Sequence, residues 1–199
     1  MRKLSRILLL LVVAAAMAFA VFWYSRPSDL DFEEFRAAVP HADASRFAEV
    51  EGVGRVHYQE RGRGRALVLI HGNNSSAYSW AEVLDQLAGE FRVVALDLKG
   101  FGFTAKPEGD YRVETQAALV VRLLDKLGIE RATLCGSSMG GAVALAAAIN
   151  YPQRVEALIL VGSSAFTETR GGSLAPAYLR WPYIGGAVTA LALTSDALV

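Results

Sequence analysis

A serine flanked by glycines is the residue of this chain best suited to covalent chemistry. Residues Gly136–Gly140 read GSSMG, which matches the pattern G-x-S-x-G with Ser138 at its centre. A strand-like run, Arg131–Cys135, precedes the pattern, and a small, apolar helical run, Met139–Asn150, follows it. A serine on so sharp a turn takes strained backbone angles and points its hydroxyl at a helix N-terminus, where free amides stabilise negative charge. Ser138 is therefore the candidate nucleophile, and close packing of a glycine-rich loop against a helix is the structural alternative.

Histidine, the usual base for such a nucleophile, occurs only before Ser138. His71 directly follows a strand-like run, whereas we expect His57 to face away from the site on an early strand and His41 to lie in an irregular segment. The carboxylates that follow the serine are Glu156, Glu168 and Asp196. A serine without a base is a weak nucleophile because its hydroxyl stays near its free pKa. The sequence thus supplies a nucleophile without an obvious partner.

Short apolar runs alternate with helical periodicity along the middle of the chain. The predicted strands are Arg55–Glu60, Ala66–Ile70, Phe91–Leu98, Arg131–Cys135 and Val155–Val161. The predicted helices are Trp80–Leu87, Glu114–Leu127 and Met139–Asn150. Such alternation indicates βαβ units and an α/β fold, with a mostly parallel sheet and flanking helices. Ligands of such sheets bind at the carboxyl ends of the strands, where His71, Asp97 and Ser138 all fall.

Composition excludes several classes of protein. The chain has 199 residues, of which 53% are hydrophobic and 20% charged, so it can bury a core and is too apolar for a disordered tail. Twenty basic and 20 acidic residues give a formal net charge of zero, which argues against a nucleic-acid partner. The lone Cys135 excludes an internal disulfide framework.

The first 24 residues are typical of a membrane anchor or a signal segment. Three basic residues precede Ile7–Tyr24, a run without charge, proline or glycine. A membrane-spanning helix needs about 20 such residues, and a basic flank stays cytoplasmic. We therefore predict a single-pass anchor, a tether over residues 25–46 and a domain exported to the periplasmic or extracellular side. The alternative is a secreted protein, cleaved near Ala20 after the small-residue pattern Ala-Phe-Ala.

Three motifs together resemble the α/β-hydrolase superfamily. The first is His71–Asn74 (HGNN) after a predicted strand, and the second is Asp97–Thr104 (DLKGFGFT) after the next strand. The third is the GSSMGG turn around Ser138. Their order and spacing agree with the family over residues 47–164, the N-terminal part of a hydrolase core. The resemblance implies an α/β-hydrolase fold with a nucleophile elbow.

Carried over residue by residue, the resemblance makes Ser138 the nucleophile. The backbone amides of Met139 and Asn73 match the oxyanion hole, with Asn74 as the less favoured second donor. Such preorganised amides stabilise a developing oxyanion by about 3 kcal/mol each. His71 is implied to be structural, bonding the loop near the oxyanion hole. The resemblance implies no metal and no cofactor.

The other motif residues have more modest expected roles. Asp97, Gly100 and Gly102 are expected to shape a turn rather than to perform chemistry. Tyr78 and Trp80 either line the pocket or pack in the core.

The serine at the elbow narrows the branch of the family. Relatives that cleave carbon–halogen bonds or epoxides have an aspartate there, although HGNNSSAYSW and DLKGFG look somewhat like the dehalogenase branch. The SSMGG sequence resembles esterases, carbon–carbon bond hydrolases and perhydrolases. Because the nucleophile decides the chemistry, we follow Ser138.

The family places its acid and its histidine after the serine, in that order. No histidine follows Ser138, so we expect that the chain is truncated before both residues and that these 199 residues alone are inactive. Residues 165–199 are then the start of a lid or cap region. A sheet that lacks its last strands would also leave an open edge.

The leading hypothesis is a membrane-tethered serine hydrolase that cleaves a carboxylic ester or a related acyl substrate. Its small-molecule substrate would be lipophilic, because the predicted lid is apolar and residues 7–24 point to the membrane. One alternative is a non-catalytic, hydrolase-like binding module. Another is the same machinery acting as a carbon–carbon bond hydrolase or perhydrolase.

Overall fold

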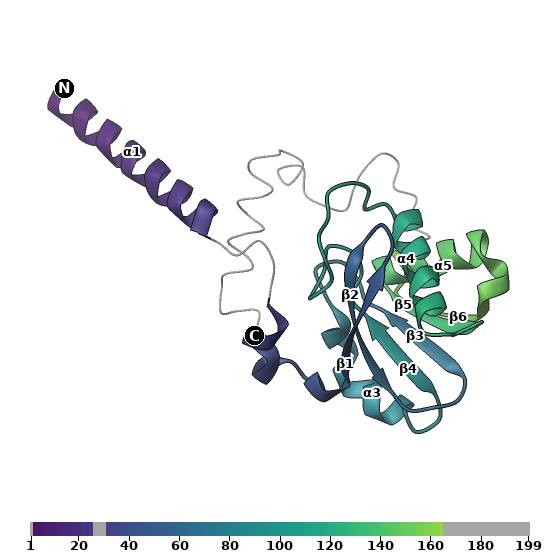
Figure 1. Ribbon diagram of the computed structural model, residues 1–199. Helices are drawn as coiled ribbons and strands as arrows, with labels where there is room; N and C mark the ends of the chain where they lie inside the picture. The colour runs from purple at the N-terminus through teal and green to yellow at the C-terminus, as the bar shows by residue number, and fades with distance from the viewer. Residues whose placement is uncertain (1, 26–30, 165–199) are drawn as a thin grey trace. The chain divides into compact units, whose positions relative to one another are not determined.

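The computed structural model describes residues 2–25 and 31–164, so the predicted lid region, residues 165–199, lies outside the described residues (Figure 1). The N-terminal helix α1 spans Arg2–Ser25 and includes the run predicted to be helical. In the described part of the chain, no helix combines the length and the apolar character that crossing a membrane requires. The anchor predicted over residues 7–24 finds no support there.

A six-stranded sheet, in the order β1-β2-β4-β3-β5-β6, forms the centre of the described fold (Figure 1). Its strands are β1 (Ser45–Val50), β2 (Gly54–Arg61), β3 (Ala66–Ile70), β4 (Arg92–Leu96), β5 (Ala132–Ser137) and β6 (Val155–Val161). Neighbours from β4 through β3 and β5 to β6 are parallel, whereas β1 and β2 pair antiparallel to their neighbours. The predicted α/β fold with a mostly parallel sheet is therefore confirmed.

Helices cover both faces of the sheet, which explains why its central strands are apolar throughout. These helices are α3 (Ala81–Leu87), α4 (Val113–Lys126) and α5 (Met139–Asn150). Every residue of β3 is buried. Val68 and Ile70 pack in the large core cluster with α4 and α5, whereas Leu67 and Leu69 pack in a smaller cluster with α3. Successive side chains of a strand point to opposite faces, so two covered faces require an uninterrupted apolar run.

The predicted elements are present with small shifts of their ends. Helix α5 and strand β6 have the predicted bounds. Strand β1 was not predicted, and it begins at Ser45, inside the segment interpreted as a tether. Strands β2 and β3 are consecutive in sequence but not adjacent in the sheet, because β4 lies between them.

The segment that precedes β1 is also folded. It contains α2 (Phe32–Phe35), which Asp31 caps by accepting a hydrogen bond from the Glu33 amide at 2.8 Å. Two short 3₁₀ helices follow, η1 (Arg36–Ala38) and η2 (Ala42–Ala44). Phe32 is buried, so this segment packs on the domain.

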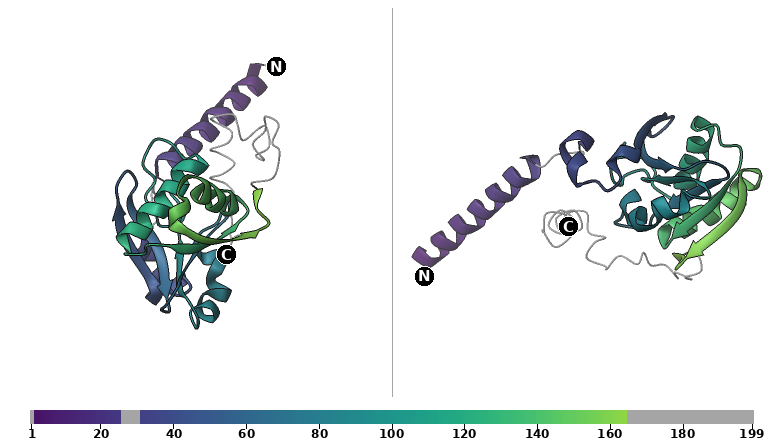
Figure 2. Two further views of the ribbon diagram at one scale, coloured as in Figure 1. Left: turned by 90° about the vertical axis from the view of Figure 1, so that its right-hand side faces the viewer. Right: turned by 90° about the horizontal axis from the view of Figure 1, so that it is seen from below.

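Strand β6 lies at the border of the described sheet (Figure 2). Within the described residues it pairs with β5 alone. Ile159 and Val161 are 46% and 48% exposed, although they belong to an apolar strand. An apolar edge strand with unpaired backbone groups is prone to pair with other chains.

Candidate active site

Ser138 lies on a sharp turn between β5 and α5. Its backbone has φ 51° and ψ −117°, a conformation that residues other than glycine rarely adopt. The Ser138 amide donates to the carbonyl oxygen of Val161 at 3.0 Å. Its own carbonyl oxygen accepts hydrogen bonds from the amides of Gly141 at 3.0 Å and Ser164 at 3.1 Å. Three backbone hydrogen bonds therefore hold the strained residue in place.

The glycines around Ser138 are required by the crowding of the turn. A Cβ atom on Gly140 would lie 2.5 Å from the carbonyl oxygen of His71 and even closer to that of Ile70. A Cβ atom on Gly136 would overlap the carbonyl oxygen of Gly140. The start of α5 is thus pressed against the end of β3. This close approach is the physical reason for the glycines in the motif.

The loop after β3 passes directly beside the serine. A Cβ atom on Gly72 would lie 3.2 Å from Ser138 Cβ and 3.8 Å from Ser138 Oγ. Asn73 follows this contact in the chain, and Met139 is the first residue of α5. Asn74 has a left-handed φ of 53°. Asn73 and Met139, the residues assigned to the oxyanion hole, thus directly follow Gly72 and Ser138 in the chain.

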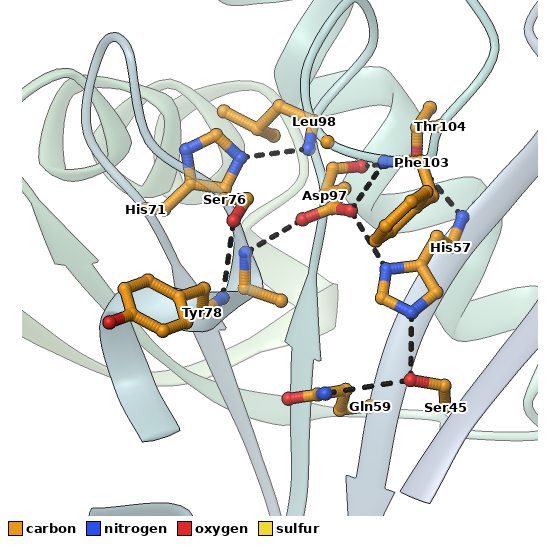
Figure 3. Close-up of polar contacts among 12 residues, drawn as sticks. Ser45, His57, Gln59, His71, Ser76, Tyr78, Asp97, Leu98, Phe103 and Thr104 are labelled. Carbon is orange, nitrogen blue, oxygen red and sulfur yellow. Dashed lines mark hydrogen bonds and ion pairs between the residues drawn. The ribbon is translucent and has the colours of Figure 1, made fainter. Parts of the chain in front are cut away.

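His71 has both ring nitrogens engaged. Its Nδ1–H donates to the carbonyl oxygen of Gly72 at 2.7 Å, and its Nε2 accepts from the Leu98 amide at 3.1 Å (Figure 3). The ring is fully buried and packs edge-on against Phe101. Burial lowers the pKa of His71, which keeps the ring neutral. His71 therefore shapes the loop, as the resemblance implies, and has no free nitrogen to act as a base.

We expect protonation of His71 to weaken the fold in mildly acidic solution. Because burial lowers its pKa in the folded state, the unfolded chain takes up the proton first. The stability due to neutral His71 is thus complete above the ordinary histidine pKa of about 6.5 and is lost as the pH falls below it. Urea unfolding between about pH 7.5 and pH 5.5 measures this loss. In His71→Gln the slope against pH should be shallower, and an equal slope would contradict the assignment.

His57 lies on an early strand, as predicted, but its side chain has a buried polar partner that the sequence did not indicate. It lies 2% exposed on β2, and its Nδ1–H donates to Asp97 Oδ2 at 2.8 Å (Figure 3). Its Nε2 lies 3.0 Å from Ser45 Oγ, and its backbone amide donates to Thr104 Oγ1 at 2.9 Å. The antiparallel pairing of β2 with β4 brings His57 beside Asp97, at the end of β4.

Three further residues named in the sequence analysis are His41, Trp80 and Tyr78. His41 hydrogen-bonds the carbonyl oxygen of Ala81 at 2.9 Å and lies 3.5 Å from an Asp85 carboxylate oxygen. Trp80 packs against the smaller core cluster, and Tyr78 is 64% exposed. In the residues that the structure describes, no group of three or more His, Cys, Asp or Glu side chains could hold a metal ion.

Comparison with known proteins decides the family. The sequence model of the alpha/beta hydrolase fold matches residues 65–181, more than half of the chain. The chain belongs to this family.

Among curated relatives of this alpha/beta hydrolase is the 2-hydroxy-6-oxo-2,4-heptadienoate hydrolase of Pseudomonas putida. It is 38% identical over 127 residues, which cover 62% of this chain and 46% of the relative. The 2-hydroxymuconate semialdehyde hydrolase of a Pseudomonas species is 39% identical over 123 residues, covering 59% of this chain and 44% of the relative. The chain thus spans less than half the length of these curated relatives.

Solved structures of hydrolases share the fold. The epoxide hydrolase CorEH is 33% identical with a TM-score of 0.62, covering 75% of this chain and 54% of that one. A bacterial membrane phospholipase A is 31% identical with a TM-score of 0.61, covering 80% of this chain and 52% of that one.

The sequence analysis of this alpha/beta hydrolase did not name the buried Gln116 and assigned no role to the buried Thr104. The Gln116 carboxamide on α4 binds both the amide and the carbonyl oxygen of Lys99, each at 3.0 Å. Thr104 donates its hydroxyl to the carbonyl oxygen of Asp97 at 2.8 Å. Gln116 thus holds Lys99 against α4, whereas Thr104 closes the turn that the Asp97–Thr104 motif forms. Gln116 interrupts an otherwise apolar helix face, and buried polar groups usually have partners.

Proposed function

We propose that this alpha/beta hydrolase is a serine hydrolase that cleaves a carboxylic ester or a related acyl substrate. The observation that carries the proposal is the strained Ser138 at the start of α5, with Gly72 of the preceding loop packed against it. The free amides at a helix N-terminus favour the negative charge that develops during acyl transfer. The turn also exposes a serine hydroxyl where a parallel sheet binds its ligands.

In the proposed reaction, Ser138 Oγ bonds to the carbonyl carbon, and the π electrons move to the carbonyl oxygen. The amides of Asn73 and Met139 stabilise this oxyanion. Collapse of the intermediate expels the alcohol, which takes up the serine proton. Water then attacks the acyl-enzyme and releases the acid, which restores the hydroxyl of Ser138.

The proposed reaction also needs a base at Ser138, and the histidines among the described residues make their hydrogen bonds elsewhere. His71 uses both of its ring nitrogens elsewhere, and His57 is buried against Asp97. No histidine follows Ser138 in the sequence. We therefore expect this chain alone to acylate slowly and to turn over little.

A carbon–carbon bond hydrolase is the second candidate. The relatives named 2-hydroxy-6-oxo-2,4-heptadienoate hydrolase and 2-hydroxymuconate semialdehyde hydrolase favour it, at 38% and 39% identity. The same serine at the elbow suits both chemistries. Parallel assays of the whole protein with p-nitrophenyl esters and with a 2-hydroxy-6-oxo-dienoate separate the two.

We expect a fluorophosphonate probe to label Ser138 of the folded chain. The serine oxygen would bond to phosphorus as fluoride leaves with the proton. Peptide mass spectrometry over several hours, with heat-denatured protein as the baseline, locates the label. Ser138→Ala should remove the label, and Ser137→Ala, at the preceding residue, should retain it. Labelling no faster than the denatured baseline would instead favour the non-catalytic binding module.

A separate proposal concerns where the protein acts. We infer that residues 1–24 direct export and place the hydrolase domain on the periplasmic or extracellular side, either tethered or released by cleavage near Ala20. The support is the basic flank and apolar run of this segment. The intact mass of labelled protein from each cell fraction tests the proposal. A loss of about 2 kDa means cleavage, and recovery at full mass from the cytosol contradicts export.

A further inference from the structure

The loop that borders Ser138 is hydrogen-bonded at its two ends to two consecutive residues, Leu98 and Asp97. At its start, the His71 ring accepts the Leu98 amide at 3.1 Å. At its end, the Ala77 amide donates to Asp97 Oδ1 at 2.6 Å. We call residues 72–76, between these anchors, the oxyanion loop. Asn73 and Asn74 within it are exposed. Its two anchors therefore set where the loop lies relative to Ser138.

Of the two anchors, the Asp97 carboxylate makes the larger number of hydrogen bonds. It is 1% exposed and accepts three N–H groups. Oδ1 accepts from Ala77, whereas Oδ2 accepts from His57 at 2.8 Å and from the Phe103 amide at 2.9 Å (Figure 3). Hydrogen bonds to a carboxylate are stronger than neutral ones, and they have the greatest effect where water is excluded.

His57 connects this carboxylate to the segment that precedes β1. Its ring lies 5.1–5.6 Å from the rings of Phe32, Phe47 and Phe103. Its Nε2 contacts Ser45 Oγ at 3.0 Å. The neighbouring Gln59 donates to the carbonyl oxygen of Pro40 at 2.6 Å, which holds the same segment. A continuous series of contacts thus runs from Phe32 through His57 and Asp97 to the oxyanion loop.

We propose that Asp97 is a positioning residue for the oxyanion loop, and that His57 makes the position of the loop depend on the docking of residues 31–45. This inference rests on the proposed function, because it assigns the loop to the oxyanion hole. The residues act through the backbone amide of Ala77 and touch no reacting atom. When residues 31–45 are docked through Phe32, His57 and Asp97 hold the oxyanion loop in its reactive arrangement.

Asp97→Asn tests the anchor with little change in volume. An amide presents one oxygen and one NH₂ group, yet N–H donors face both oxygens of the carboxylate. Because Oδ2 has two donors and Oδ1 has one, the asparagine oxygen should stay with His57 and Phe103. Its NH₂ group then faces the Ala77 amide, so the oxyanion loop specifically loses its anchor.

Hydrogen exchange and probe labelling together measure the outcome. In Asp97→Asn, we expect exchange in residues 71–80 to accelerate about tenfold and labelling of Ser138 to slow about tenfold, as expected for one lost buried hydrogen bond. Exchange in residues 132–150, which include the serine turn, should stay near that of the wild type. Phe32→Ala should shift both readouts in the same direction by about threefold, because it removes the ring that packs against His57 and leaves the hydrogen bonds of Asp97 in place.

Gln116→Leu is the matched control. Gln116 is as buried as His57 and makes two hydrogen bonds near the same end of the sheet, but only to Lys99. Its loss should leave residues 71–80 and the labelling rate within about twofold of the wild type. Unchanged loop exchange in Asp97→Asn, or equal loosening of residues 132–150, would overturn the proposal. If wild-type Ser138 does not label at all, the proposed function fails, while the exchange measurement still tests the anchor.

Discussion

Replacing Gly140 by alanine should destabilise the fold by about 3 kcal/mol or more. The added Cβ would overlap the carbonyl oxygens of Ile70, the last residue of β3, and of His71, the residue after it. Backbone atoms at the centre of a sheet cannot turn aside as a flexible side chain can. To make room, α5 must therefore move off β3, and Ser138 must move with it.

Two other glycines separate this clash from the general effects of the substitution. Gly89→Ala adds a Cβ at an ordinary 3.5 Å from the carbonyl oxygen of Gln86, so stability should change by less than about 0.5 kcal/mol. Gly128 has φ 64° with nothing within 4 Å, so Gly128→Ala should cost only the left-handed strain of about 1–2 kcal/mol. Urea unfolding measures all three. A Gly140→Ala loss no greater than that of Gly128→Ala would mean that α5 is not held against β3.

Apolar periodicity made most of the sheet predictable. Strand β3 is an uninterrupted apolar run because helices cover both of its faces, and that environment is readable from the sequence. Helix α5 was predicted with its observed bounds because Tyr151–Pro152 ends a run of small apolar residues. In these elements, the local sequence and the final environment favour the same structure.

Strand β1 was missed because its stability is not local. Ser45–Val50 mixes exposed and half-buried positions, and the strand forms by pairing with β2, where Phe47 lies opposite His57. Nothing within six residues of sequence specifies that partner. Long-range pairing is the part of a fold that propensity describes least well.

The same limit applies to His57, whose partner was not predicted. Its position on an early strand was predicted, but the direction of its side chain depends on which strand lies next to β2. Since β4 rather than β3 occupies that place, the carboxylate at the end of β4 comes within 2.8 Å of the ring. A histidine in a buried strand does indicate a polar partner, but the sequence does not show which one.

Replacing Ser138 by glycine should remove the reactive hydroxyl and stabilise the fold at the same time. The serine has φ 51° and ψ −117°, a conformation that glycine adopts readily and that costs other residues about 1–3 kcal/mol. Glycine also increases the entropy of the unfolded chain, which offsets about 0.4–1 kcal/mol of that gain. We therefore expect Ser138→Gly to be about 1 kcal/mol more stable than Ser138→Ala in urea unfolding.

Comparing glycine with alanine isolates the backbone, because both variants lack the hydroxyl and neither should be labelled by a fluorophosphonate. If the glycine variant is no more stable than the alanine variant, the backbone at Ser138 is not strained. The three hydrogen bonds at Ser138 then stabilise an ordinary loop conformation. If it is more stable, this position retains a strained serine where glycine would fold better. Strain of this kind persists when the side chain is needed in one direction, here toward the N-terminus of α5 and the loop at Gly72.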